Sequence, residues 1–315
     1  MATGPMATGP VPADPTANRP TAGTGLERTA VGAVPLAYAE EGRGGRPLLA
    51  VHGFTGAKED FAAQARRLAR SGWHTVMPDL RGHGASPTPA TGYDLTTMAA
   101  DLAGLVDSLG WTRFALLGHS MGGMVAQRLA VDLAARAGRA SSPVAALVLV
   151  GTTDGPVPIE RSLVELACTV VADGGMPALL AAQKALGTAL VTSSASADRL
   201  RVLHPDWDGY RDRSLLACAP AMYVEAARGL LDTPSRLDEL AGLRVPVLVV
   251  VGDEDTVMLP GSRRLAAGIP GARLVVVEGA GHHPQAEHPE AFAATVADFL
   301  DAALPGAGRA SGPAP

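Results

Sequence analysis

The chain has 315 residues, of which 47% are hydrophobic, so it can bury a substantial core. Its formal net charge of −5 excludes the strongly basic surface of a nucleic-acid-binding protein. Its two cysteines, Cys168 and Cys218, are too few for a disulfide framework, and we expect two free thiols, or a single bridge if the protein is exported.

Both ends of the chain have a composition that cannot bury a core. Residues 1–25 contain the duplicated sequence MATGP and are rich in Pro, Thr, Ala and Gly, and residues 305–315 are similar. The N-terminus lacks the basic start and apolar block of a signal peptide. No apolar run reaches the roughly 18 residues of a membrane-spanning helix. We interpret residues 1–25 and 305–315 as disordered tails and predict a soluble, cytoplasmic protein without a membrane span.

Apolar blocks alternate with amphipathic stretches along most of the remaining chain. Residues 27–41 are predicted to form an antiparallel hairpin. The later strand candidates are Pro47–Val51, His74–Pro78, Phe114–Leu117, Val144–Val150, Val245–Val251 and Arg273–Val277. The helix candidates are Glu59–Arg70, Leu95–Leu109, Met124–Ala137, Ser262–Ala267 and Pro289–Leu304. Short strands that alternate with helices indicate βαβ units, hence an α/β fold with a mostly parallel central sheet and helices on both faces.

This alternation stops between residues 155 and 240, where apolar residues fall at helical spacings without a clear strand. Because the stretch separates two strands of the predicted sheet, we predict a helical cap over the carboxyl edge of that sheet. Residues 26–154 and 241–304 then form the core, and the alternative is one elaborate crossover. The substrate pocket is expected to be mostly apolar. Candidates for its lining, or alternatively for the cap's own core, are Met176, Leu179, Leu180, Trp207, Met222 and Tyr223.

The most informative motif is Gly118-His119-Ser120-Met121-Gly122, which directly follows the apolar run Phe114–Leu117. A strand that enters G-x-S-x-G and continues as a helix is a nucleophile elbow, in which the turn is so sharp that the serine backbone is strained. The helix that follows directs N–H groups and a positive dipole end toward the same place. The motif therefore predicts Ser120 as a nucleophile.

A second motif, His52–Gly56 (HGFTG), follows the predicted strand Pro47–Val51. Glycines let such a loop turn tightly and present backbone N–H groups to a bound oxygen. An acyl-transfer enzyme needs two donors of this kind. We predict that the backbone N–H groups of Phe54 and Met121 form the oxyanion hole.

An acid and a histidine follow later strands, at the edge of a parallel sheet where ligands bind. Gly252–Asp255 (GDED) ends one strand and offers three acids, between which position alone does not choose. His282, in the sequence GAGHH, follows the strand Arg273–Val277 and suits a general base toward the Ser120 hydroxyl. His283 is its neighbouring competitor.

Together these motifs, in the order HGFTG, GHSMG, GDED and GAGHH, resemble the α/β-hydrolase superfamily over residues 27–304, as does Asp79–Ser86 (DLRGHGAS). The nearest likeness is to small esterases, enol-lactonases and carbon–carbon hydrolases. The resemblance selects Asp255 from GDED and His282 from GAGHH, and it leaves Asp154, after an earlier strand, as a rival acid. A serine at the elbow disfavours epoxide hydrolase and dehalogenase chemistry, which the superfamily performs with aspartate.

The sequence thus predicts a serine hydrolase that cleaves a small or medium carboxylic ester or lactone through an acyl-enzyme. The triad is predicted to be Ser120, Asp255 and His282, and no metal or cofactor is expected. The alternatives are cleavage of a carbon–carbon bond in a vinylogous diketone by the same residues, or a non-catalytic small-molecule receptor on the same fold.

Deletion of residues 1–25 should leave activity and melting temperature nearly unchanged, because their composition cannot bury a core. Thermal denaturation of the full-length and shortened proteins checks this expectation. A large fall in melting temperature would show that the segment packs on the folded protein.

Overall fold

The computed structural model describes residues 34–137, 142–186 and 194–304. The two predicted tails and the first part of the predicted hairpin lie outside these residues. Seven strands form one sheet in the order β1-β3-β2-β4-β5-β6-β7. The strands are β1 (Tyr38–Glu41), β2 (Arg46–Val51), β3 (Trp73–Pro78), β4 (Phe114–His119), β5 (Val144–Val150), β6 (Val247–Gly252) and β7 (Arg273–Val277).

All neighbouring strands are parallel except β1, which pairs antiparallel with β3. The sequence analysis did not predict this pairing, and the hairpin over residues 27–41 stays a prediction because its first part lies outside the described residues. Tyr38 lies opposite Pro78 and Glu41 opposite Thr75, so the partner of β1 comes from about 35 residues later in the chain. Local alternation can mark a strand, but it carries no information about which strand it pairs with.

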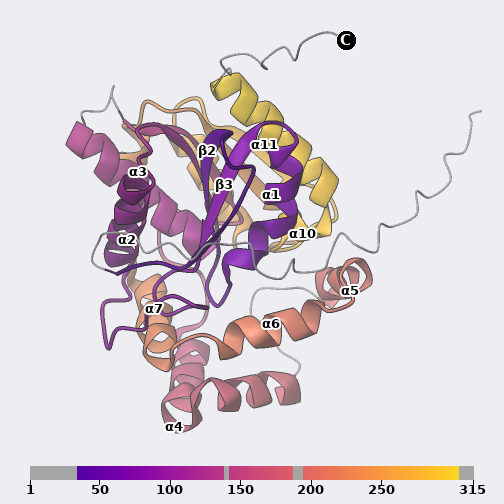
Figure 1. Cartoon of the computed structure of the whole chain (residues 1–315). Helices are drawn as coiled ribbons and strands as arrows, with labels where there is room; N and C mark the ends of the chain where they lie inside the picture. Colours follow the sequence, from indigo (N-terminus) through magenta and orange to yellow (C-terminus); the bar gives the residue numbers. More distant parts are fainter. Residues whose placement is uncertain (1–33, 138–141, 187–193, 305–315) are drawn as a thin grey trace, which may run out of the picture.

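The sheet is covered on both faces because alternate residues of each strand point to opposite sides. In β2, Leu48 and Ala50 pack in the cluster beneath α1 (Ala62–Ala69) and α11 (Pro289–Ala303). Their neighbours Leu49 and Val51 belong to the cluster on the other face. That face is covered by α2 (Leu95–Ser108) and α3 (Met121–Ala137) (Figure 1), and α9 (Leu259–Gly268) contributes Leu265 to the same cluster.

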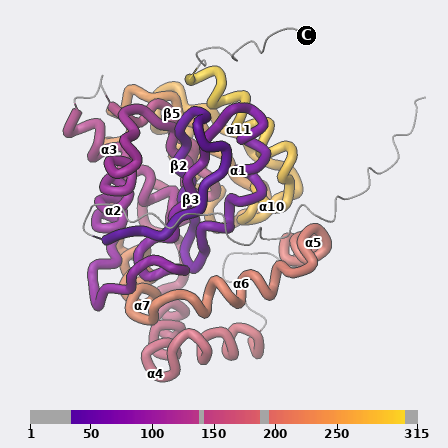
Figure 2. The backbone as a smooth tube through the Cα atoms, in the orientation of Figure 1, coloured from indigo at the N-terminus to yellow at the C-terminus, as the bar shows by residue number. Residues whose placement is uncertain are grey.

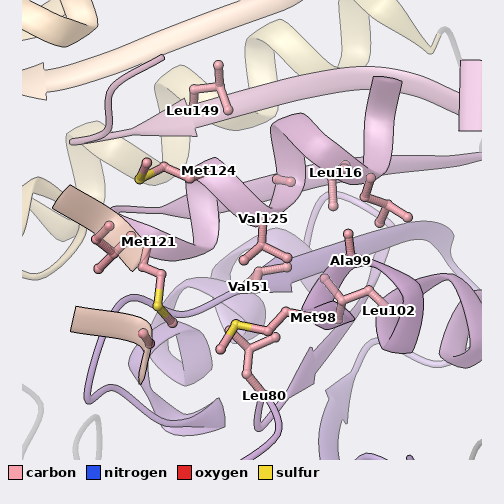
Figure 3. Close-up of a cluster of buried hydrophobic side chains, with 14 of the residues drawn as sticks. Val51, Leu80, Met98, Ala99, Leu102, Leu116, Met121, Met124, Val125 and Leu149 are labelled. Carbon is pink, nitrogen blue, oxygen red and sulfur yellow. The ribbon is translucent and has the colours of Figure 1, made fainter. Parts of the chain in front are cut away.

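Figure 3 shows the second cluster close up, where α2 and α3 meet the sheet. Met98 and Leu102 of α2 pack with Val125 of α3, near Val51 and Leu116 of the strands. All five side chains are fully buried. Burying large apolar side chains contributes about 1.5–3 kcal/mol each, so this contact anchors α3, and with it the turn that precedes α3.

The segment between β5 and β6 forms a separate helical layer. Its helices are α4 (Arg161–Leu186), α5 (Ser194–Leu203), α6 (Trp207–Leu216) and α7 (Pro220–Asp232), here called the cap layer. The cap layer lies beyond one end of the sheet, apart from the helices that cover the faces (Figures 1 and 2). Helix α8 (Leu237–Ala241) then returns the chain to β6, while η1 (Lys58–Phe61) precedes α1 and α10 (Pro284–Glu287) precedes α11.

Helix α4 is long and apolar enough, by length and composition alone, to cross a membrane, contrary to our expectation that no such run exists. In the fold it is broken at Gly175, whose φ of 68° is not helical, and Pro177 follows the break. Its buried residues, among them Val164 and Val171, lie in the same hydrophobic cluster as Met222 and Tyr223 of α7. In the described fold, α4 is therefore two shorter helices packed within the cap layer.

The sharp turn predicted at Ser120 is present, and the strand and helix on either side of it extend closer to Ser120 than the sequence predicted. The strand extends to His119 and the helix begins at Met121, so that Ser120 alone makes the turn. Its φ of 54° lies in the left-handed region that side chains disfavour. The turn leaves no space beside it, because a Cβ added at Gly122 would lie 2.2 Å from the carbonyl oxygen of His52.

Replacing Gly122 by alanine should therefore destabilise the protein by about 1–3 kcal/mol or more, since backbone and not a flexible side chain would have to move. Gly229→Ala in α7 is the matched control, because nothing lies within 4 Å of a Cβ there. Alanine in that helix should be neutral or stabilising by up to about 1 kcal/mol. Denaturant unfolding of both variants checks the pair; equal stabilities would contradict the close approach at Gly122.

Candidate active site

The backbone of Ser120 is held by the neighbouring strand. Its N–H donates to the carbonyl oxygen of Val150, at the end of β5, at 2.9 Å. Its own carbonyl oxygen accepts the hydroxyl of Thr152 at 2.7 Å and the N–H of Gly123 at 2.9 Å. Strain of this kind costs about 1–3 kcal/mol and persists only where the surroundings fix it. These hydrogen bonds hold the hydroxyl at the tip of β4.

The side chains of Ser120, His282 and Asp255 form one hydrogen-bonded chain. The Nε2 atom of His282 lies 3.0 Å from the Ser120 Oγ atom, and Nδ1 lies 2.7 Å from Oδ2 of Asp255. The second oxygen of Asp255 accepts the N–H of Met258 at 3.0 Å. Because a carboxylate only accepts, Nδ1 of His282 carries the proton and Nε2 is free to accept the Ser120 hydroxyl. The sequence prediction named these three residues, and the structure brings them together.

The other acids that the sequence offered have different partners. The Asp154 carboxylate accepts hydrogen bonds from Ser235 Oγ at 2.6 Å and from Arg264 Nε at 3.1 Å. It therefore fixes the segment that follows the cap layer. The backbone carbonyl of Asp154 also accepts the N–H of Arg236 at 2.9 Å. Asp253 is exposed, and Glu254 pairs with Arg199 of α5. Among these acids, Asp255 alone contacts His282 in the described residues.

Sequence reasoning missed a carboxylate that supports the loop of His282. Glu287 is buried and accepts the N–H of Gly281 at 2.9 Å and that of His283 at 3.3 Å, the residues on either side of His282. Arg199 of α5 forms an ion pair with Glu287 at 2.9 Å. The positive charge of Arg199 offsets the cost of burying the Glu287 carboxylate. The only sequence signal is an acid five residues after the histidine, just before the predicted helix Pro289–Leu304.

The loop His52–Gly56 presents Phe54 next to Ser120. Nδ1 of His52 donates to the carbonyl oxygen of Gly53 at 2.8 Å, while its Nε2 accepts the N–H of Leu80 at 3.0 Å. The Gly53 carbonyl also accepts the N–H of Gly56. In a trans peptide the carbonyl and the next N–H point in opposite directions, so the N–H of Phe54 is turned away from these partners. Met121 begins α3, where N–H groups have no partner within the helix.

Two further histidines surround His282 and stay neutral. The rings of His119 and His283 lie 4.7 Å and 5.3 Å from that of His282, between ring centres. Burial lowers the pKa of both well below the usual histidine value, and neighbouring positive charge lowers it further. The Nε2 of His119 donates to the carbonyl oxygen of His282 at 2.8 Å. His283 therefore lies beside the base position and has no carboxylate partner in the described residues.

A cavity of about 300 Å³ connects these groups to the cap layer. One part of its wall is apolar, with Leu180, Tyr223 and Leu230, and another part on α6 is polar. Trp207 lines the cavity, as the sequence predicted. Met176 and Met222 do not line it and lie in the hydrophobic core, so our alternative interpretation describes them. Met222 packs against the backbone of Gly82, which helical spacing alone could not reveal.

The two cysteines do not line the cavity. Cys168 and Cys218 are buried free thiols. Within residues 34–137, 142–186 and 194–304, no group of three or more His, Cys, Asp or Glu side chains is arranged to hold a metal ion.

Several known proteins resemble this chain over most of its length. It is 32% identical over 266 residues to a pimeloyl-[acyl-carrier protein] methyl ester esterase of Neisseria meningitidis, covering 81% of this chain and 76% of the relative. A thermophilic esterase from Thermogutta terrifontis, solved with malate bound, superposes with a TM-score of 0.72 and 28% identity, covering 88% of this chain and 98% of that one.

The enol-lactonase from Burkholderia xenovorans LB400 superposes equally well, with a TM-score of 0.72 and 26% identity over 87% of this chain and 99% of that one. Residues 46–289 match the family described as the alpha/beta hydrolase fold, which includes both motif loops, the cap layer and the histidine loop. The chain therefore belongs to the α/β-hydrolase family.

Proposed function

We propose that this protein is a serine hydrolase that cleaves a small or medium carboxylic ester or lactone through an acyl-enzyme. The observation that carries the proposal is the continuous hydrogen-bonded chain from the Ser120 hydroxyl through His282 to Asp255. Ser–His–Asp arrangements are recognised by this geometry and by the roles of the residues, irrespective of their sequence positions. The names of the esterase and enol-lactonase relatives support the same class of substrate.

In the first half of the reaction, Ser120 Oγ attacks the carbonyl carbon and His282 Nε2 takes its proton. The carbonyl oxygen becomes an oxyanion, which accepts the backbone N–H groups of Phe54 and Met121. Such preorganised donors each contribute about 10²–10³-fold to the rate. The acyl–oxygen bond then breaks, and His282 passes the proton to the departing alkoxide.

In the second half, water attacks the acyl-enzyme while His282 again acts as the base. The acid is released and the proton returns to Ser120. Asp255 stabilises the positive charge that His282 carries in each half, and it holds the ring with Nε2 toward the serine. The neutral state of His119 and His283 matters here, because a second positive ring next to His282 would oppose that charge.

The substitution Ser120→Ala should abolish turnover of p-nitrophenyl acetate and labelling by a fluorophosphonate probe while the protein stays folded. Losses of about 10³-fold or more are usual when a triad member is removed. Circular dichroism confirms folding of the variant. Retained turnover with Ser120→Ala would remove the basis of the proposal.

Comparing Asp255→Asn with Asp154→Asn tests the identity of the acid. The first should lose about 10²- to 10⁴-fold in kcat, because an amide can favour the wrong imidazole tautomer and cannot stabilise the imidazolium. The second removes a charge that pairs with Arg264 and should affect turnover mildly. Both variants are measured with one ester. A severe loss at Asp154 with a mild one at Asp255 would reverse the assignment.

A further inference from the structure

Arg211 on α6 is the cation of the cavity that lacks an ion-pair partner among the described residues. Its side chain is half-buried and lines the same cavity as Ser120. Its one hydrogen bond in the described part of the chain goes to Thr55 Oγ1, at 3.5 Å. By contrast, the other basic side chains of α4 to α6 each pair with a carboxylate in the described chain. They are Arg161, Lys184, Arg199, Arg201 and Arg213.

The contact with Thr55 locates the guanidinium beside the loop His52–Gly56, since Thr55 directly follows Phe54. Its charge also reaches the imidazoles: it contributes to lowering the pKa of His119 and of His283, after burial and the neighbouring histidines. Arg211 is thus close enough to the reacting groups to contact a substrate held on Ser120.

The acids of the same cavity already have partners. Asp208 pairs with Arg201, and Asp212 pairs with Lys184. Asp60 accepts the Tyr210 hydroxyl, a group that stays protonated because burial and the charge of Asp60 raise its pKa well above the usual value. Asp60 and Arg211 line the same cavity without a direct hydrogen bond between them. The rival explanation for Arg211 is therefore that it only balances the negative charge of Asp60.

We propose that Arg211 binds a carboxylate of the substrate, so that the preferred substrates are esters or lactones that carry an anionic end. The planar guanidinium can donate two parallel hydrogen bonds to a carboxylate, and such charge-assisted pairs are stronger than neutral ones. The apolar wall formed by Leu180, Tyr223 and Leu230 would then hold the hydrocarbon part. This inference rests on the proposed function, because it specifies the substrate of the Ser120 site.

The test compares each anionic ester with its neutral methyl ester. Monomethyl and dimethyl esters of dicarboxylic acids with four to eight carbons, roughly the size the cavity admits, carry the carboxylate on the acyl side. Hexanoyl glycolate and its methyl ester carry it on the alcohol side. In at least one series, Arg211→Gln should lower the anionic-to-neutral ratio of kcat/KM by about 10- to 100-fold. Most of the change should appear in KM, because the arginine binds ground state and transition state alike.

Arg213→Gln is the matched control. It removes an arginine from the same helix, but its side chain is exposed, pairs with Asp206 and does not line the cavity. It should leave the ratio as in the parent protein. Arg211→Lys should retain only part of the preference, since an ammonium lacks the planar fork. A ratio unchanged by Arg211→Gln, or a common loss for anionic and neutral esters, would overturn the inference, the latter pointing to charge balance with Asp60.

A binding measurement separates this inference from the reaction itself. Calorimetry with Ser120→Ala compares unreacted monomethyl adipate with dimethyl adipate, and repeats both with Ser120→Ala/Arg211→Gln. Tighter binding of the monoanion that disappears with Arg211 supports the anion site, even if no ester is turned over and the proposed function fails. Equal affinities for both esters, together with ester turnover by the parent protein, would leave the proposed function standing and refute the role of Arg211.

Discussion

The left-handed backbone of Ser120 is the constraint on which the rest of the site depends. A hydroxyl can project from the tip of β4 only if the chain reverses within one residue, and that brings the start of α3 against the end of β2. Cβ atoms at Gly118 and Gly122 would lie 2.3 Å and 2.2 Å from backbone oxygens. The same contact brings the loop after β2, with Phe54, beside the first N–H groups of α3. Strain at one residue thus brings the Ser120 hydroxyl close to the proposed oxyanion donors.

The position of the site follows from the sheet order. The chain leaves β2 toward α1 on one face, and it leaves β4 toward α3 on the other. Between adjacent strands whose connections diverge, a crevice opens at the carboxyl edge, which is where open α/β sheets bind ligands. Of the three adjacent imidazoles there, His282 is the one with a carboxylate partner among residues 34–137, 142–186 and 194–304. Burial keeps His119 and His283 neutral, so the charge that develops during the proposed reaction concentrates on one ring.

The sheet and the elbow were predictable from local patterns, namely apolar runs and glycines at fixed offsets. Local patterns also located acids and histidines after later strands, but the family resemblance was needed to choose Asp255 and His282 among them. The pairing of β1 with β3 was not predictable, since it joins segments distant in sequence. For the same reason Glu287 and Arg211 were missed. The role of Glu287 depends on the backbone N–H groups beside His282. Arg211 stands out because it has no ion-pair partner in the part of the chain that the structure describes, and this becomes visible only once the cap layer is packed. Met176 and Met222 show the converse, because helical spacing marks a buried face without telling a core from a cavity.

Asp154 holds the two ends of the cap insertion close together at the sheet. Its side chain and backbone carbonyl bind Ser235 and Arg236, so the chain enters and leaves the insertion through adjacent points. An insertion whose ends already touch adds little closure entropy when it grows or shrinks, and domain insertions succeed at such places. The sheet can therefore keep its reacting groups while one insertion is exchanged for another. Within this architecture, substrate range can evolve, or be engineered by grafting, separately from the chemistry.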